Sequence, residues 1–278
     1  MDQYNAPQSL DSIVLERYEQ QYLTMSDNAS LRVLHHRPKN PKATLYFLPG
    51  WLTLPMSWER VLPRLADDNY HVEYFESREK STADLPKGAE ITKQRMIQDV
   101  GESIRLLNLD EYIAIASSLG STTIIHAMAQ QKLSPEPMHT IIEGVWDFKV
   151  MSPLLHLINS ATYPLIKTFV KRGMHRKYTD AADPEQSAKY SLGLDLAIAD
   201  RIKKSAQAWN GDEIWNEIPK INAHYIVIGA RKDKLHPTET MHRIAYELPN
   251  ATYIEFETNK EAHDIHLVDL INRIFENR

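Results

Sequence analysis

The sequence contains no cysteine and little glycine, and both shortages restrict what the protein can do. Without cysteine there is no disulfide bond, no thiolate metal site and no cysteine nucleophile. Any covalent catalysis must therefore use another nucleophile. Only 9 of the 278 residues are glycine, which is less than half of the usual share of about 7%. The few backbone positions that keep a glycine should therefore be informative.

Long apolar runs and an excess of basic residues are also missing. No stretch approaches the roughly 18 apolar residues of a membrane-spanning helix, and the first residues lack the basic and then apolar pattern of a secretory signal. The 32 Lys and Arg against 37 Asp and Glu give a formal net charge of −5, which argues against a nucleic-acid-binding surface. We expect a cytoplasmic protein without a membrane span and without a nucleic-acid partner. No oligomeric state follows from the sequence.

Short apolar runs typical of buried strands alternate with segments of helical periodicity through most of the chain. The expected strands are residues 18–25, 31–36, 44–48, 71–75, 112–116, 140–145, 224–228 and 252–256. The expected helices are residues 58–65, 91–107, 122–130, 238–248 and 264–275. The first two strands flank a turn and predict an antiparallel hairpin. The later alternation predicts a parallel sheet with helices on both faces, which is an α/β fold.

One long segment, residues 147–211, has helical patches but no strand pattern. We interpret it as a helical cap inserted into a core domain of residues 1–146 and 212–278. Its apolar side chains predict packing against the core and an apolar roof over a pocket; they are Met151, Leu154, Leu155, Ile158, Tyr163, Leu165, Ile166 and Phe169. The basic cluster at residues 171–177 is interpreted as a solvated face, and its alternative role is to attract anionic substrates.

Ser118 is the candidate nucleophile. Ligands of open parallel sheets bind beyond the carboxyl ends of the strands, and Ser118 follows the expected strand at 112–116. A reactive serine on a sharp turn between strand and helix needs small residues two positions before and after it. Ala116 and Gly120 satisfy this requirement, whereas Ser117 and Ser121 lack such neighbours. The alternative role of Ser118 is to cap the following helix.

The segment from Ala116 to Gly120 resembles the nucleophile elbow of the α/β-hydrolase family, with Ala116 in place of the commoner glycine. The resemblance extends from the hairpin to the last helix and implies the α/β-hydrolase fold with a variable helical cap. Residues 229–237 are similar to the acid loop of the family, which implies Asp233 as the acid. The alternative acid is Asp147, because some family members carry the acid after the preceding strand.

The family's histidine lies in a loop just before the last helix, which implies His263 rather than His266 as the catalytic base. The resemblance further implies an oxyanion hole formed by the backbone N–H groups of Leu119 and Trp51. Proline stands before Gly50 where the family usually has histidine. The loop at residues 76–81 is similar to a family loop that usually carries glycine, but no glycine is present here.

These residues predict a serine hydrolase that cleaves small to medium carboxylic esters through an acyl-enzyme intermediate. Ser118 would attack the ester carbonyl, His263 would move the proton, and Asp233 would orient the imidazole. Alternative substrates of the same triad are a thioester, a lactone or a C–C bond beside a ketone. A different hypothesis is a non-catalytic protein that binds a small molecule under its cap. No cofactor or metal is expected, and His126 is interpreted as a buried core histidine.

Overall fold

The computed structural model describes residues 12–145, 157–177 and 184–276. Its eight strands form one sheet in the order β1-β2-β4-β3-β5-β6-β7-β8. The strands are β1 (Glu19–Thr24), β2 (Ser30–His36), β3 (Thr44–Leu48), β4 (His71–Phe75), β5 (Ile113–Ser117), β6 (His139–Glu143), β7 (Tyr225–Ala230) and β8 (Ala251–Phe256). The helices of the core are α1 (Ser12–Leu15), α2 (Leu62–Asp67), α3 (Lys93–Leu106), α4 (Leu119–Ala129), α8 (Thr238–Glu247), α9 (Asn259–Ala262) and α10 (Ile265–Glu276).

The sheet is mostly parallel. Strand β2 pairs antiparallel with both β1 and β4, and every pairing from β4 through β3, β5, β6 and β7 to β8 is parallel. The N-terminal hairpin and the parallel sheet predicted from the sequence are therefore confirmed. The carboxyl ends of the parallel strands meet at one edge, where ligands bind in open sheets of this kind.

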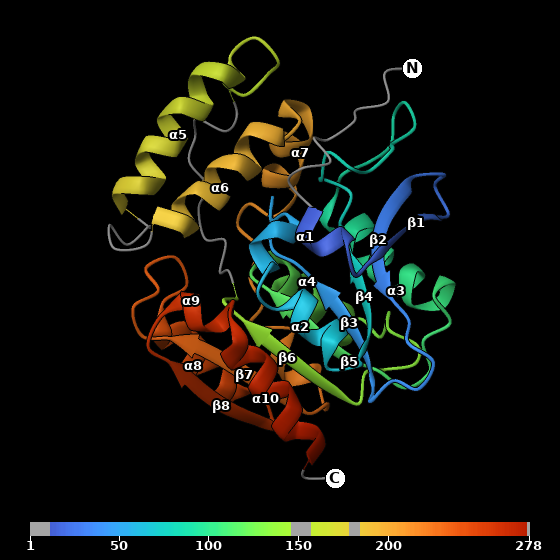
Figure 1. The fold of residues 1–278 in the computed structure, drawn as a ribbon. Coiled ribbons are helices and arrows are strands. Elements are labelled where there is room, and N and C mark those ends of the chain that lie inside the picture. The colour runs from blue at the N-terminus through green and yellow to red at the C-terminus, as the bar shows by residue number, and fades with distance from the viewer. Residues whose placement is uncertain (1–11, 146–156, 178–183, 277–278) are drawn as a thin grey trace.

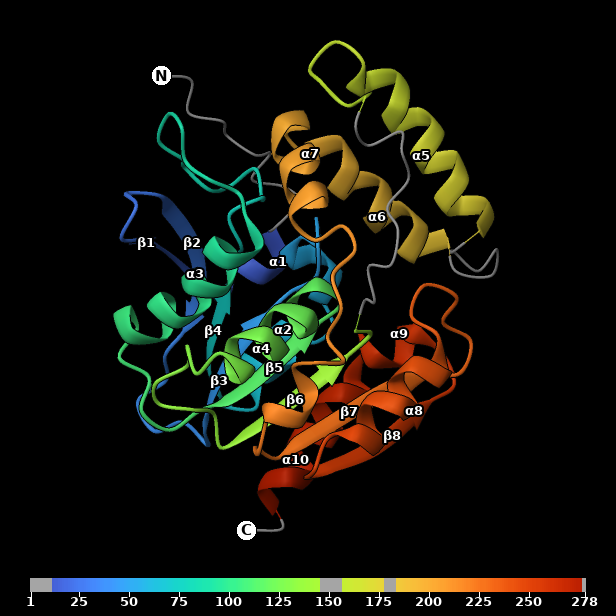
Figure 2. The same cartoon turned by 180° about the vertical axis from the view of Figure 1, so that it is seen from behind.

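Helices cover both faces of the sheet, as Figures 1 and 2 show from opposite sides. Side chains alternate between the faces because successive residues of a strand point in opposite directions. In β3, Tyr46 and Leu48 pack with α3, α4 and α8, whereas Leu45 and Phe47 pack with α1, α2 and α10. The central strands are therefore apolar on both sides, which explains their continuous apolar runs.

Three further helices lie between β6 and β7: α5 (Tyr163–Lys177), α6 (Pro184–Leu196) and α7 (Ala199–Ala208). They gather beyond the carboxyl ends of the strands, with α5 outermost (Figure 1). Ile158, Tyr163 and Ile202 form a small apolar cluster there, against which Trp51 and Leu52 of the core pack. Of the apolar residues expected to face the core, Leu165 and Phe169 are exposed instead, and Met151, Leu154 and Leu155 lie outside the described residues.

The expected helix at residues 58–65 is divided into two elements. A 3-10 helix, η1 (Pro55–Trp58), precedes α2, which begins at Leu62. Pro63 explains the second start, because proline has no N–H to donate and is accommodated only in the first turn of a helix. The apolar spacing of this segment indicated which side chains are buried. It did not indicate that the helix breaks between Trp58 and Leu62.

Candidate active site

Ser118 occupies a sharp turn between β5 and α4. Its φ of 50° and ψ of −116° lie in a region that non-glycine residues rarely adopt, and such a backbone costs about 1–3 kcal/mol. The Ser118 N–H donates to the Glu143 carbonyl at the end of β6, at 3.0 Å. A Cβ on Gly120 would lie 2.2 Å from the Leu48 carbonyl oxygen, so the turn requires glycine there. These constraints hold the Ser118 hydroxyl at the carboxyl edge of the sheet.

Two hydrogen bonds connect Ser118 through a histidine to a carboxylate. Ser118 Oγ lies 3.0 Å from Nε2 of His236, and His236 Nδ1 lies 2.9 Å from Oδ2 of Asp233. A carboxylate only accepts hydrogen bonds, so Nδ1 carries the imidazole proton in the neutral ring. Nε2 is then free to accept the hydroxyl proton of Ser118. This is the relation that a serine nucleophile, a base and an orienting acid require.

The loop after β7 holds both Asp233 and His236 in place. The other Asp233 oxygen, Oδ1, accepts from the N–H of Leu235 at 2.7 Å and from that of His236 at 3.1 Å. Gly144, just beyond β6, has a φ of +56°, and a Cβ there would lie 2.9 Å from His236 Nδ1. The absence of a side chain at Gly144 therefore makes room for the imidazole.

Charges around His236 favour its protonated form. Burial by itself lowers the pKa of a histidine, but the charge of Asp233, its hydrogen bond and the charge of Glu143 outweigh burial and raise the pKa of His236. Burial likewise raises the pKa of Asp233, yet His236 and the two backbone N–H groups bring that pKa below its ordinary value. The pair thus consists of an ionised carboxylate and an imidazole with increased affinity for a proton.

The structure brings together two of the three residues that the sequence predicted for the triad. Ser118 and Asp233 meet through His236, and no hydrogen bond joins His263 to Ser118 in the described part of the chain. His263 Nδ1 instead lies 2.9 Å from the Asn259 carbonyl oxygen, and its Nε2 lies 3.4 Å from a Glu143 carboxylate oxygen.

The remaining candidates have other surroundings. The His263 ring packs on Trp58, with 4.3 Å between ring centroids. His266 lies in the first turn of α10, and its ring contacts Phe256. The alternative acid, Asp147, lies outside the described residues. His126 is buried in α4 and pairs with Asp212 at 2.7 Å.

Sequence reasoning missed His236, although a signal was present. His236 follows Asp233 by three residues in the loop after β7, so both stand at the same edge of the sheet as Ser118. A loop that closes on itself brings residues three positions apart into contact, as the two backbone hydrogen bonds to Asp233 do here.

The residues predicted to supply the oxyanion donors lie beside Ser118. The Leu119 N–H belongs to the first turn of α4, where backbone N–H groups have no partner within the helix. The loop after β3 also approaches Ser118, since a Cβ on Gly50 would lie 3.1 Å from the Ser118 Cβ. Trp51, the next residue, donates its indole N–H to Ser205 of α7 at 2.9 Å. Thus α7 is attached to the loop that carries the second predicted donor.

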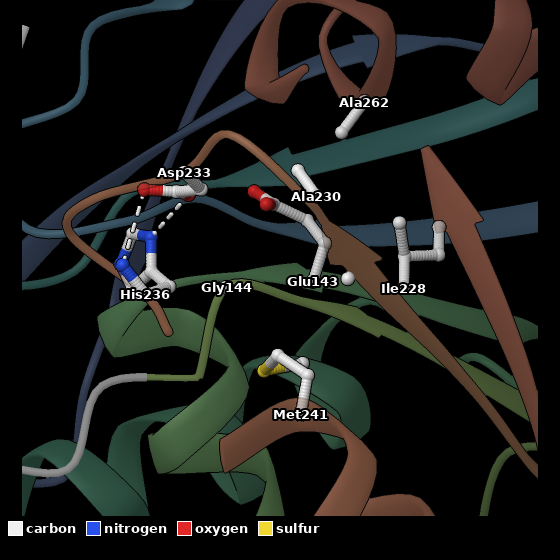
Figure 3. A pocket seen from close by; sticks show the side chains of 9 residues that line it. Glu143, Gly144, Ile228, Ala230, Asp233, His236, Met241 and Ala262 are labelled. Atoms are coloured by element: carbon white, nitrogen blue, oxygen red, sulfur yellow. Dashed lines mark hydrogen bonds and ion pairs between the residues drawn. The ribbon is translucent and has the colours of Figure 1, made fainter. Parts of the chain in front are cut away.

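A small pocket lies next to the His236 and Asp233 pair (Figure 3). Its lining residues are Glu143, Gly144, Ile228, Gly229, Ala230, Asp233, His236, Met241 and Ala262. Ser118 does not line this pocket, so we regard it as space behind the imidazole and not as the substrate pocket. Its importance is that the Glu143 carboxylate shares it with the imidazole.

The described residues contain neither a metal-binding cluster nor a helix suited to a membrane. No group of three or more His, Asp or Glu side chains there is arranged to hold a metal ion. No helix in the described ranges combines the length and the apolar character needed to cross a membrane.

Comparison with solved structures identifies the fold. A hydrolase from Pseudomonas aeruginosa superposes with a TM-score of 0.75 at 14% identity, covering 94% of this chain and 99% of that one. An esterase from Exiguobacterium antarcticum gives a TM-score of 0.74 at 16% identity, covering 93% and 97%. An enol-lactonase from Burkholderia xenovorans gives 0.72 at 15% identity, covering 93% and 100%.

These similar structures share the α/β-hydrolase fold, and this chain adopts it over nearly its whole length. The fold class predicted from the sequence is therefore confirmed. No protein-family model matches the sequence, and no curated protein sequence matches it.

Proposed function

We propose that the protein is a serine hydrolase that cleaves small to medium carboxylic esters through an acyl-enzyme intermediate. The observation that carries the proposal is the pair of hydrogen bonds from Ser118 through His236 to Asp233, at 3.0 and 2.9 Å. The position of these residues at the carboxyl edge of a parallel sheet supports it, as does the strained elbow at Ser118.

In the proposed mechanism Ser118 Oγ forms a bond to the ester carbonyl carbon while His236 Nε2 takes the hydroxyl proton. Asp233 stabilises the imidazolium that forms. The negative charge on the carbonyl oxygen is bound by the N–H groups of Leu119 and Trp51. The alcohol then leaves with the proton from His236, and a water molecule repeats the sequence to release the acid and regenerate Ser118.

The activities named for similar structures suggest which substrates to test on this protein. They include an esterase and an enol-lactonase, and a lactone is a cyclic ester that the same steps would open. A panel should therefore contain p-nitrophenyl esters of increasing acyl length, a simple lactone and a thioester. We also infer that residues 147–211 act as a cap over a core of residues 1–146 and 212–278, because α5 to α7 lie beyond the strand ends.

Substitution of the nucleophile tests the proposal directly. We expect Ser118→Ala to abolish labelling by a fluorophosphonate and to lower kcat about 10⁴-fold or more, because it removes the atom that forms the acyl-enzyme. Ser117→Ala is the matched control, since Ser117 is the adjacent serine on the same turn. Labelling that survives in Ser118→Ala would contradict the assignment. A folded wild-type protein that neither reacts with the probe nor turns over any substrate would favour the non-catalytic binding hypothesis.

A second pair of variants identifies the base. We expect His236→Asn to reduce kcat by several orders of magnitude, because Ser118 then loses its proton acceptor. His263→Asn should retain most of the activity, because no hydrogen bond joins His263 to Ser118 in the described residues. The opposite result would return the base to His263, the residue predicted from the sequence.

A further inference from the structure

A buried lysine contacts the loop that carries a predicted oxyanion donor. Lys80 is only 3% exposed, and its Nζ donates a hydrogen bond of 2.5 Å to the Gly50 carbonyl oxygen. Lys80 belongs to the segment of residues 76–81 after β4, where the resemblance led us to expect glycine. In place of a glycine, this segment carries Lys80, and its ammonium group lies next to the loop after β3.

Because the peptide bond is planar, the contact between Lys80 and the Gly50 carbonyl also orients the Trp51 N–H. The Gly50 carbonyl and the Trp51 N–H belong to one peptide unit, and in a trans peptide they point in opposite directions. Holding the carbonyl toward Lys80 therefore aims the Trp51 N–H away from Lys80. The same peptide lies beside the nucleophile, given the 3.1 Å between an added Gly50 Cβ and the Ser118 Cβ.

Packing alone does not explain a lysine at this position. Removing an ammonium group from water is costly, and an apolar side chain of similar volume is often equally stable or more so. Lys80 is paired with the fully buried Glu79 at 3.1 Å, which offsets part of the cost. A hydrogen bond from a cation also polarises the peptide that accepts it and strengthens the N–H at its other end as a donor.

Helix α7 fixes both partners of this contact. Arg201 donates to the carbonyl oxygens of Lys80, at 2.5 Å, and of Ala83, at 2.9 Å. Ser205, one turn further along α7, accepts the indole N–H of Trp51 at 2.9 Å. The position of the lysine and that of the Trp51 side chain are thus set by the same helix.

We propose that Lys80 is a positioning residue that orients the Gly50–Trp51 peptide so that the Trp51 N–H binds the oxyanion. This inference rests on the proposed ester hydrolysis by Ser118. It assigns to the loop after β4 a role in stabilising the transition state, and Lys80 itself does not touch the substrate.

The test compares Lys80→Met with wild type on a p-nitrophenyl ester and on a trifluoromethyl ketone, which forms an oxyanion adduct with a reactive serine. We expect kcat to fall about 10- to 100-fold, somewhat less than the loss of an entire oxyanion donor, with KM changed less than about twofold. The Ki of the ketone should rise by the same factor as kcat/KM falls. Lys80→Arg keeps a cationic donor and should recover most of both quantities.

Lys93→Met is the control, because it removes a lysine whose partner is the Asp212 carboxylate, at 2.5 Å, in place of a loop carbonyl. It should leave kcat and Ki unchanged. If Lys80→Met does not fold, Lys80→Gln provides the same comparison, since its shorter amide does not reach the Gly50 oxygen. A folded variant without the lysine donor that keeps the wild-type kcat and Ki overturns the role of Lys80. A wild-type protein without turnover dependent on Ser118 overturns the proposed function, and this inference with it.

Discussion

Several glycines at the carboxyl edge of the sheet leave no space for a side chain. A Cβ on Gly120 would lie 2.2 Å from the Leu48 carbonyl oxygen, a backbone atom that cannot move aside without shifting the strand. Gly144 combines a close approach to His236 with a positive φ. In a chain with few glycines, these positions are ones where a backbone and a neighbouring group approach too closely for any other residue.

Gly144 allows a prediction with an internal control. Gly144→Ala and Gly211→Ala each place alanine at a positive φ, +56° and +72°, but nothing lies within 4 Å of an added Cβ at Gly211. Both should lose about 1–2 kcal/mol of stability from backbone strain. Only Gly144→Ala should also lower kcat, because the new methyl group displaces the His236 ring. Urea unfolding and ester kinetics measure the two effects, and equal kinetics in both variants would contradict this account of Gly144.

Ser118 and Asp233 were easier to select from the sequence than the histidine that connects them in the structure. Ser118 and Asp233 follow strands whose ends are evident from the apolar pattern, so their place at the carboxyl edge could be predicted. Two histidines, His236 and His263, follow the last two strands, and the sequence pattern does not tell which ring points at Ser118. That depends on how the loop after β7 closes through the Asp233 hydrogen bonds and on the space beside Gly144.

The loop after β4 uses charged side chains in place of the expected glycine. Arg78 is fully buried and donates to both oxygens of Asp99 in α3, at 2.5 and 2.6 Å. It also donates to Asp27 at 2.8 Å and to the Glu90 carbonyl at 2.6 Å. Arg78 thereby connects the loop to α3 and to the N-terminal hairpin.

We expect Arg78→Met to lower the free energy of unfolding by about 3–5 kcal/mol, because it removes a fully buried guanidinium and leaves the buried Asp99 carboxylate with Arg95 alone. Arg231→Met is the control, since Arg231 forms ion pairs with Glu255 and Glu257 but its side chain is 65% exposed. Exposed pairs are screened by water and often contribute nothing measurable. Chemical denaturation of both variants at pH 7 provides the comparison. A loss that is no larger for Arg78→Met than for Arg231→Met would contradict the structural role of the buried network.

The bounds of strands and helices with a strong apolar pattern were predicted closely. The break between η1 and α2 within the expected helix at residues 58–65 was not predicted. The expected strand at residues 44–48 coincides with β3, and the expected helix at 238–248 ends one residue beyond α8. Burial on both faces produces the apolar runs from which such strands are predicted. The charged contacts of the loop after β4 join residues far apart in sequence, so no local pattern reveals them.

The charges of the whole molecule predict how its stability depends on pH. Basic partners outweigh the opposing effect of burial and lower the pKa values of several carboxyls, among them Glu73, Glu76, Asp212 and Asp233. These groups add stability above their unfolded pKa of about 4, and that stability is lost as the pH falls through the lower folded values. His236 has the opposite sign. Its raised pKa adds stability below about pH 6.5, which is lost as the pH rises through the folded value.

We therefore expect the melting temperature to be highest between about pH 5 and 6.5 and to decline on both sides. Calorimetric scans from pH 3 to 9 measure this profile. His236→Gln should flatten the decline on the alkaline side, and it should also weaken the acid decline, because His236 helps to lower the pKa of Asp233. Asp212→Asn should reduce the acid decline, because it removes a carboxylate whose pKa His126 and Lys93 bring below its ordinary value against the effect of burial. An alkaline decline that His236→Gln leaves unchanged would contradict the contribution of His236.

The fold itself survives very low sequence identity. The chain superposes on solved structures over more than nine-tenths of its length at 14–16% identity. The order of the apolar strands and the resemblance around Ser118 were sufficient to predict the fold class. The sequence predicted that residues 147–211 contain helices, but not how α5, α6 and α7 pack. Helices of similar apolar content can pack in many ways.

The two contacts of α7 have a consequence for any movement of this helix. In the proposed mechanism, α7 holds the Trp51 side chain through Ser205 and the Lys80 loop through Arg201. A movement of α7 away from the core would thus break the contacts that orient the oxyanion donor. The proposed oxyanion site would therefore be complete only while α7 stays in contact with both loops. A ligand large enough to wedge α7 outward would bind without reacting, and would be an inhibitor instead of a slow substrate.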